Sequence, residues 1–466
     1  MSIRDNENRE MVQHAADPGS SSSNPRTVLM FAYYFPPCVC WPTAAARAAN
    51  FARYLPEFGW RTIVVTRDLT TAPCKCETPS RGPSLHAVDD SEQVDPIAVP
   101  VSLESSHLLK RRDQLARSKL TGPIRPLVTL LRKSLTAMIV TTGRSDTWIP
   151  TGIRAGERVL ETSTIDAVWT TSGPLESISI GQHFARGYRL PWVADLRDSV
   201  SHLAGSMPDS LAEYLRRRSF AFRLRNATRV VEVTPQERER DRRWLSDNVD
   251  VIPSGFDPAD WDIIHKASAA RRPEPRRGTT IAYTGHTYRS QDPTPFFLGV
   301  RHFTKSRNEA TNLRIDYYGP SGSEFTAAAA ACGVADFVRD HGVVSIHRAR
   351  TAMAQADVLL LFSHRGVSGL PGGKFYEYLA SGTPILVVPA GDEYIDGTLA
   401  TTGTGLAAST PEEVRHALEK LLFSPLDTAP DFAARTRMFG WPSRAESLAT
   451  LLNEAVQTAT SEPSHR

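Results

Sequence analysis

A glycine pair followed by a lysine and a glutamate has the residue types needed to hold a phosphorylated sugar. Gly372, Gly373 and Lys374 precede Glu377, and a turn and an apolar run follow at 382–388. The pattern predicts a glycine loop, a short helix, a turn and a buried strand. Backbone amides of the loop and the positive end of the helix would face an anion. Since Glu377 lies one helical turn beyond Lys374, a phosphate and a sugar hydroxyl could both be bound here, which indicates a nucleotide-sugar site.

Other short motifs occur in a fixed order along the chain. They are YYFPP at 33–37, TSGP at 171–174, DLRD at 195–198, IPSGFD at 252–257 and YTG at 283–285. Together with GGKFYEYLASGTP at 372–384, they resemble the retaining glycosyltransferases of family four, also called group one. The resemblance covers about residues 27–450. It implies an α/β fold of the GT-B type: two Rossmann-like parallel-sheet domains face a cleft, and the C-terminal helix crosses back to the first domain.

The resemblance also implies an activity. Such an enzyme transfers a sugar from a UDP- or GDP-sugar to an acceptor hydroxyl with retention, in polysaccharide, glycolipid or natural-product biosynthesis, and uses no metal and no cofactor besides its donor substrate. One position departs from the family pattern, because Gly369 stands where a second glutamate is usual. Two alternatives therefore stay open: a catalytically degenerate GT-B binding protein and a nucleotide-sugar epimerase.

Several residues take donor-site roles by this resemblance. Arg289 and Lys374 are expected to neutralise the departing diphosphate, because an arginine fork and a compact ammonium both suit phosphate oxygens. Glu377 corresponds to the glutamate that binds the ribose, and Gly285 opens the second half of the chain beside Arg289. Arg47 matches an arginine of the family in the first helix, where it would contact the donor or form an ion pair within the protein.

Polar residues that follow strands of the first half are candidates for contact with the acceptor or the sugar. Ser172, Asp195 and Asp198 come at or after predicted strand ends, where open parallel sheets bind ligands. His183 lies near the place of a family histidine. For His183 the alternative is a structural helix histidine, and for the aspartates it is an internal pair with arginine.

The alternation of apolar strands and helical periods gives the domain organisation. The expected strands are 27–34, 61–66, 165–170, 192–195 and 229–233, and then 280–283, 313–318, 343–344, 358–362 and 385–388. The predicted parts are a tail at 1–25, an N-terminal acceptor domain at 26–265, a linker at 266–278, a donor domain at 279–435, a crossover helix region at 436–458 and a tail at 459–466.

Composition limits the class of protein. The 466 residues are 41% hydrophobic and 23% charged, which is ordinary for a globular chain. The formal net charge is only +3, so nucleic acid is not a predicted partner. No apolar run is long enough to span a bilayer, and the N-terminal residues have no apolar signal region. We expect a cytoplasmic enzyme.

Residues 107–140 carry many basic side chains interleaved with leucines, and Asp113 is their only acid. Two interpretations stay open: a helix that contacts the inner face of a membrane, or a helix that covers the sheet with a solvated basic face. The acceptor is accordingly expected to be a small molecule or a lipid-linked sugar.

Five cysteines, an odd number, argue against a disulfide framework. The pairs Cys38–Cys40 and Cys74–Cys76 each follow a predicted strand, so they would be either a four-thiolate metal site or free loop thiols. Asp260 and Asp262 have the spacing of a metal-binding Asp-x-Asp but lead towards the linker, so we interpret them as incidental.

Overall fold

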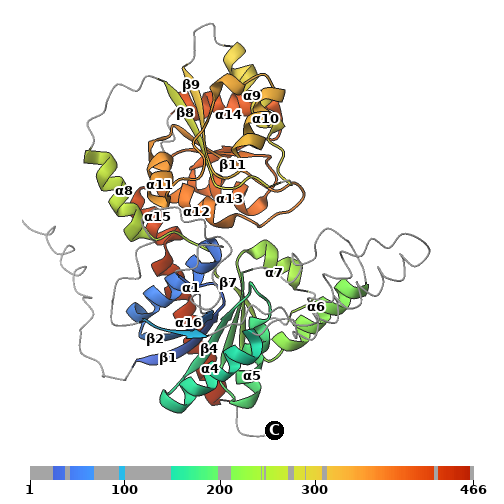
Figure 1. Cartoon of the computed structure of the whole chain (residues 1–466), viewed down its shortest axis with the longest axis vertical. Coiled ribbons are helices and arrows are strands. Elements are labelled where there is room, and N and C mark those ends of the chain that lie inside the picture. The colour runs from blue at the N-terminus through green and yellow to red at the C-terminus, as the bar shows by residue number, and fades with distance from the viewer. Residues whose placement is uncertain are drawn as a thin grey trace, which may run out of the picture.

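Two parallel sheets, one above the other along the long axis of the molecule, form the framework of the computed structural model (Figure 1). The residues described are 25–36, 42–67, 94–99, 148–197, 211–242, 244–245, 248–270, 278–288, 290–306, 312–424 and 429–461. The basic segment 107–140 and Cys38, Cys40, Cys74 and Cys76 lie outside them.

The sheet of the N-terminal domain is parallel, with strand order β3-β2-β1-β4-β5-β6-β7. Its strands are β1 (Arg26–Ala32), β2 (Trp60–Arg67), β3 (Val94–Val99), β4 (Ala167–Thr171), β5 (Trp192–Leu196), β6 (Arg229–Glu232) and β7 (Val249–Val251). Central strands such as β1 are apolar along almost their whole length, because helices cover both faces of the sheet. Val28 and Met30 belong to one core, while Leu29 and Phe31 belong to the other.

The helices of this domain divide between the two faces. They are α1 (Pro42–Tyr54) with the 3₁₀ turn η1 (Leu55–Phe58), α4 (Trp148–Thr162), α5 (Ser177–Gly187), α6 (Leu211–Leu224) and α7 (Pro235–Asp241). Phe51 of α1 shares a core with Trp169, whereas Trp148 of α4 and Phe184 of α5 share the opposite core.

The C-terminal domain has a second parallel sheet, with order β10-β9-β8-β11-β12-β13. Its strands are β8 (Thr279–Thr284), β9 (Leu313–Tyr318), β10 (Val338–Asp340), β11 (Val358–Phe362), β12 (Ile385–Val388) and β13 (Gly405–Ala407). The predicted strand at 343–344 is wrong. Val338 pairs with Ile315 instead, and the chain turns at Gly342, whose φ is +64°, which leaves Val343 73% exposed.

Helices again cover both faces of this sheet. They are α9 (Thr294–Lys305), α10 (Gly322–Ala331), the turn η2 (Ala335–Phe337) and α14 (Pro411–Phe423) on one side, and α8 (Pro258–Ala270), α11 (Ile346–Gln355), α12 (Gly372–Ser381), α13 (Glu393–Thr402) and α15 (Phe432–Phe439) on the other. The phenylalanines of α9 pack with Val414 of α14, and Trp261 of α8 packs with Phe375 of α12.

Two passages of the chain connect the domains, and they lie side by side. The amide of Trp441 donates to the Phe256 carbonyl (3.0 Å), and the amide of Phe256 donates to the Phe439 carbonyl (3.1 Å). Helix α16 (Trp441–Ser461) then crosses back onto the N-terminal domain, where Leu448 and Leu452 join the core of α1. Because α8 already packs on α11 and α12, the first passage lies near Phe256, ahead of the predicted linker at 266–278.

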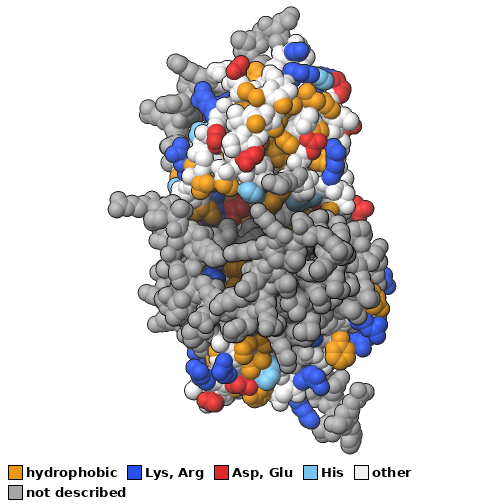
Figure 2. All heavy atoms as spheres, turned by 45° about the vertical axis from the view of Figure 1, so that its right-hand side comes forward, with side chains coloured by type: hydrophobic (Ala, Val, Ile, Leu, Met, Phe, Trp, Pro, Cys, Tyr) orange, Lys and Arg blue, Asp and Glu red, His pale blue; other side chains and the backbone are white. Residues whose placement is uncertain are grey.

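Within the described part of the chain, none of the helices combines the length and apolar character needed to cross a bilayer. On the face shown in Figure 2, acidic and basic side chains are interspersed over the described part of the upper, C-terminal domain. Cys332 is buried as a free thiol.

Candidate functional site

The carboxyl ends of β8 and β11 bring together the glycines and the lysine that the sequence singled out. Gly285 follows β8 with a φ of +95°, and its amide donates to the Tyr318 carbonyl (2.7 Å). Gly372 and Gly373 begin α12, and Gly372 is exposed with a φ of +63°. A Cβ built on Gly285 would lie 3.0 Å from Cε of Lys374, so the lysine arm lies against this turn. The structure therefore places Gly285, Gly372, Gly373 and Lys374 at one edge of the sheet.

Lys374 is a cation with no acidic partner among the described residues. Its Nζ lies 3.8 Å from the centroid of the Tyr283 ring, which attracts the ammonium through its π face. Burial of the ammonium lowers the pKa of Lys374 to about 7. A charged group that is desolvated and lacks a counter-ion is costly, and an anion at the start of α12 would offset that cost.

Glu377 faces its own domain rather than solvent. Arg350 of α11 donates from Nε and Nη2 to the two carboxylate oxygens (2.8 and 3.0 Å), and Trp261 Nε1 donates to Oε2 (2.9 Å). Arg350 also pairs with Asp260 (2.6 Å). Burial alone would lower the pKa of Arg350, but Glu377 and Asp260 outweigh it and raise that pKa. A carboxylate has about four acceptor positions, so one remains on Glu377 for a ligand hydroxyl.

Arg47 and Asp195 form a buried ion pair, which is the alternative that the sequence left open for these two residues. Nη2 of Arg47 lies 2.6 Å from Oδ1 of Asp195, its Nε lies 3.0 Å from Oδ2, and both side chains are 1% exposed. The hydroxyl of Thr171 adds a bond to Oδ2 (2.9 Å), and Nη2 also reaches the Ile252 carbonyl (2.9 Å). The Asp195 carboxylate therefore holds Nε and Nη2 of Arg47, whereas the buried Nη1 has no hydrogen-bond partner among the described residues.

Ser172 is buried behind the end of its strand, and His183 has its described partners within the first domain. Ser172 is 1% exposed, and its backbone amide donates to the Asp195 carbonyl (2.8 Å). His183 on α5 lies 3.0 Å from a carboxylate oxygen of Glu157 on α4, with its ring against Tyr188. The partners of His183 are therefore on the outer helices, which is the structural role left open above.

Two predicted residues, Arg289 and Asp198, lie outside the described residues. The Asp-x-Asp spacing falls on helix α8, where Asp260 pairs with Arg350 and Asp262 pairs with Lys266 (2.6 Å). Within the described part of the chain, no group of three or more His, Cys, Asp or Glu side chains could hold a metal ion.

Sequence reasoning missed a set of buried acids at the carboxyl edge of the first sheet. Glu232 ends β6 and is fully buried, with Glu237 and Asp241 of α7 beside it. Burial, and then the charges of Asp241 and Glu237, raise the pKa of Glu232 well above its ordinary value, which favours the neutral carboxylic acid. The sequence shows Glu232 as a single acid at the end of an apolar strand. It does not show that two acids of the next helix pack beside it.

Asp392 was also missed, although it caps α13 in a recognisable way. Its carboxylate accepts from the amides of Tyr394 and Ile395 at the helix start (3.1 and 3.2 Å). It also accepts from the amides of Gly369 and Leu370 (3.0 and 3.3 Å), which belong to the loop ahead of α12. The sequence shows an Asp before a helix but gives no sign that the amides of Gly369 and Leu370 also bind it. The contact that holds the loop ahead of α12 could therefore not be predicted.

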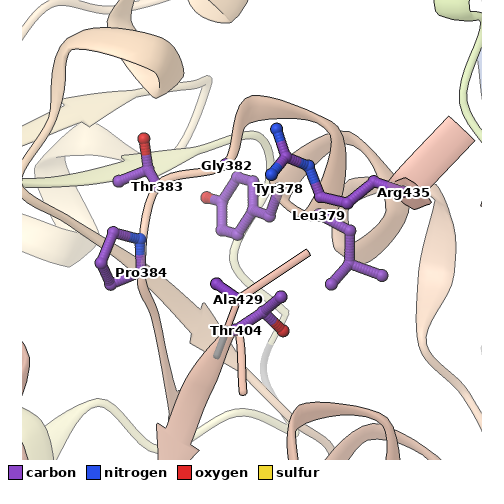
Figure 3. A pocket seen from close by; sticks show the side chains of 8 residues that line it. All are labelled: Tyr378, Leu379, Gly382, Thr383, Pro384, Thr404, Ala429 and Arg435. Carbon is purple, nitrogen blue, oxygen red and sulfur yellow. The ribbon is translucent and has the colours of Figure 1, made fainter. Parts of the chain in front are cut away.

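A cavity of about 110 Å³ lies at the opposite end of α12, away from Lys374. Figure 3 shows Tyr378, Gly382 and Arg435 among its lining side chains, with Thr404 at the start of β13. The hydroxyl of Tyr378 accepts from the Thr284 amide (3.0 Å), so this ring connects the cavity to the end of β8. The cavity is separate from the glycine turn at Gly285.

The two sheets, the glycine turns at the carboxyl edge of the second sheet and the helix that returns to the first domain define the GT-B fold. Within that fold, residues 278–424 match the family model described as "Glycosyl transferases group 1". No curated protein sequence matches the chain.

Solved structures share the fold over nearly the whole chain. Sucrose-phosphate synthase from Thermosynechococcus elongatus is 14% identical, with a TM-score of 0.58 over 93% of this chain and 100% of the other. A trehalose 6-phosphate synthase from Burkholderia multivorans is 13% identical, with a TM-score of 0.58 over 95% of this chain and 100% of the other. The Anabaena protein Alr3699/HepE, solved with UDP-glucose, is 12% identical, with a TM-score of 0.53 over 92% of this chain and 99% of the other. At these identities the likeness establishes the fold.

Proposed function

We propose that this chain is a glycosyltransferase that moves a sugar from a UDP- or GDP-sugar to an acceptor hydroxyl with retention. Lys374 neutralises the departing diphosphate, together with the start of α12 and, as the sequence predicts, Arg289. Gly285 and the glycine pair Gly372 and Gly373 lie beside Lys374 at the same edge of the second sheet. Support comes from the group 1 match over 278–424 and from the UDP and UDP-glucose complexes of HepE, which has the same fold.

The single observation that carries this proposal is that the ammonium of Lys374 faces an aromatic ring and no acid among the residues described. The protein buries this cation beside a glycine with positive φ and gives it no carboxylate among the described residues. The helix behind it adds partial positive charge at the same point. Such a place is suited to the β-phosphate of a nucleotide sugar, whose negative charge grows as the sugar departs.

The test is a binding panel of UDP, GDP, ADP and TDP followed by thermal shift and calorimetry. We expect one nucleotide to raise the melting temperature, since a ligand that binds only the native state stabilises it. Replacing Lys374 with Met should weaken that nucleotide by about 10- to 100-fold, because a charge-assisted hydrogen bond contributes about 1.5–3 kcal/mol.

The matched control is Lys305→Met, which removes an exposed lysine at the end of α9. It should leave nucleotide affinity unchanged. If the Lys374→Met protein is folded and binds its nucleotide as tightly as wild type, the assignment of the diphosphate site fails. Nucleotide binding without any turnover of nucleotide sugars would instead favour the degenerate binding protein.

Metal independence is part of the proposal. Because cations and the helix dipole carry the diphosphate charge, turnover should survive EDTA. The measurement is nucleotide release from the donor with and without chelator, using a nucleotide-sugar that the panel has identified. Activity that disappears in EDTA and returns with Mg²⁺ or Mn²⁺ would falsify this part.

The acceptor is proposed to be a small molecule or a lipid-linked sugar, and the enzyme to be cytoplasmic. If the acceptor is lipid-linked, the basic segment 107–140 should bind anionic vesicles and release as salt rises, since each surface Lys or Arg contributes about 1 kcal/mol at low salt. Co-sedimentation with phosphatidylserine vesicles at two salt concentrations decides between the two acceptor classes.

A further inference from the structure

The loop that leads into α12 is held from both domains at once. On the side of its own domain, Asp392 accepts from the amides of Gly369 and Leu370. From the N-terminal domain, the hydroxyl of Thr234 donates to the Gly369 carbonyl (3.0 Å), and Nη2 of Arg240 donates to the Ser368 carbonyl (2.6 Å). Helix α7, which carries Arg240, meets α13 at this interface (Figure 1). The backbone of residues 368–370 is therefore fixed where the domains meet.

Gly369 has no room for a side chain in this arrangement. Its φ is +84°, and a Cβ built on it would lie 2.7 Å from Cβ of Gln236 and 2.8 Å from Oγ1 of Thr234. The glutamate that is usual at this position in the family that the chain resembles would therefore collide with the first domain. The methylenes of Gln236 fill the space into which a side chain at position 369 would project.

The amide of Gln236 brings an unused polar atom to this place. Its Oε1 is buried and has no hydrogen-bond partner within the described part of the chain. A buried carbonyl without a partner is costly, and a ligand hydroxyl would satisfy it. Because a hydroxyl both donates and accepts, the match holds whichever way the amide is turned.

We propose that Gln236 determines sugar specificity by binding a hydroxyl of the donor's sugar, and that the N-terminal domain presents it across the interface. This inference rests on the proposed function, since it places the sugar of the nucleotide sugar beside the loop that precedes Lys374. Thr234 and Arg240 are positioning residues for that loop. The nucleotide is then bound by the C-terminal domain, while recognition of the sugar requires both domains together.

The experiment compares each nucleotide with its sugar conjugate by calorimetry on the full chain. The probes are UDP against UDP-glucose, UDP-galactose and UDP-N-acetylglucosamine, and GDP against GDP-mannose. Wild type should bind one conjugate more tightly than the bare nucleotide. In Gln236→Ala that ratio should fall about five- to tenfold, as expected for one hydrogen bond, while the affinity for the bare nucleotide stays within twofold.

Two further variants separate recognition from structure. Gln236→Glu keeps an acceptor at the same reach and should retain the preference for the sugar. Glu239→Ala removes an exposed carboxylate from the same helix and should change neither affinity.

An unchanged ratio in Gln236→Ala, equal losses for nucleotide and conjugate, or a wild type that prefers no conjugate overturns this inference alone. A wild type that binds no nucleotide overturns the proposed function and this inference with it.

Discussion

The carboxyl edges of the two sheets use their cations in opposite ways. At the edge of the N-terminal sheet, Arg47 is held by Asp195, Thr171 completes that carboxylate, and both charges are hidden from solvent. At the edge of the C-terminal sheet, Lys374 is half-buried, and its ammonium faces an aromatic ring instead of an acid. The cation at the first edge has a carboxylate partner within the protein, whereas the cation at the second edge is left for a ligand to neutralise.

This difference distinguishes a cation that stabilises the fold from a cation that is available to a ligand, although the two domains have similar sheets. A cation one turn into a helix, after a strand of a parallel sheet, suits both a structural pair and a phosphate site. The presence or absence of a neighbouring carboxylate decides between them. A variant that removes the charged pair at the first edge should therefore lose stability. A variant that changes the lysine at the second edge should lose nucleotide affinity.

The largest effect is expected from Asp195→Ala. Removing the acid leaves the guanidinium of Arg47 buried without its partner, which should lower the free energy of unfolding by about 3–5 kcal/mol. Urea denaturation followed by tryptophan fluorescence measures this loss. The matched control is Asp262→Ala, which breaks the exposed pair with Lys266 and should cost about 0.3–0.5 kcal/mol.

Nucleotide affinity of the Asp195→Ala protein, measured where it is still folded, should stay close to that of wild type. A folded Asp195→Ala protein that no longer binds nucleotide would make the first edge part of the donor site and erase the contrast.

A second effect concerns pH at the other edge. The free Lys374 has a pKa of about 7, and a bound diphosphate would raise it, so the complex holds more protons than the free protein above pH 7. Nucleotide affinity should therefore fall about tenfold per pH unit from pH 7 upwards, because one pKa unit corresponds to about 1.4 kcal/mol. Calorimetry at pH 6.5, 7.5 and 8.5 measures it.

Lys374→Arg is the control for this pH effect, since a guanidinium stays charged throughout that range. In the Lys374→Arg protein, nucleotide affinity should therefore change little with pH. A wild-type affinity that does not change between pH 7 and 9 would mean that the ammonium does not contact the nucleotide.

The smallest effect is expected from Glu377→Ala, because this side chain is both bonded within the protein and available to a ligand. Its carboxylate is already bonded to Arg350 and Trp261, with one acceptor position left for a ribose hydroxyl. Donor affinity should fall by about 1.5 kcal/mol, roughly tenfold, with the fold retained. The counterpart is Asp260→Ala, which removes the other partner of Arg350; if it weakens the donor equally, Glu377 acts only through the helix packing.

The sequence predicted the framework well because its signals are local. The run Ile385–Val388 marks a buried strand without reference to the rest of the chain, and its four residues are all buried. Lys374 was predicted for the same reason, since its glycines precede it directly. The strand expected at 343–344 is wrong because two valines suggested burial, whereas the chain turns at Gly342 and leaves Val343 exposed.

The charged partners could not be predicted, because they are distant in sequence. Asp195 lies 148 positions beyond Arg47, and Arg350 reaches Glu377 from another helix. Gln236 meets Gly369 only after both domains have folded and docked. Composition and spacing show which side chains are available, but pairing across a sheet or an interface depends on the packed geometry.

Helix α16 also bears on how the polypeptide is made. Domains of a growing chain generally fold in the order of their synthesis. Here Trp441, Leu448 and Leu452 complete the core that contains Val28 and Phe51. The domain that leaves the ribosome first must therefore wait for the segment translated after the whole second domain, and it exposes an unfilled apolar groove until then. Ribosome-bound chains that stop before residue 441 should accordingly be the ones that recruit chaperones.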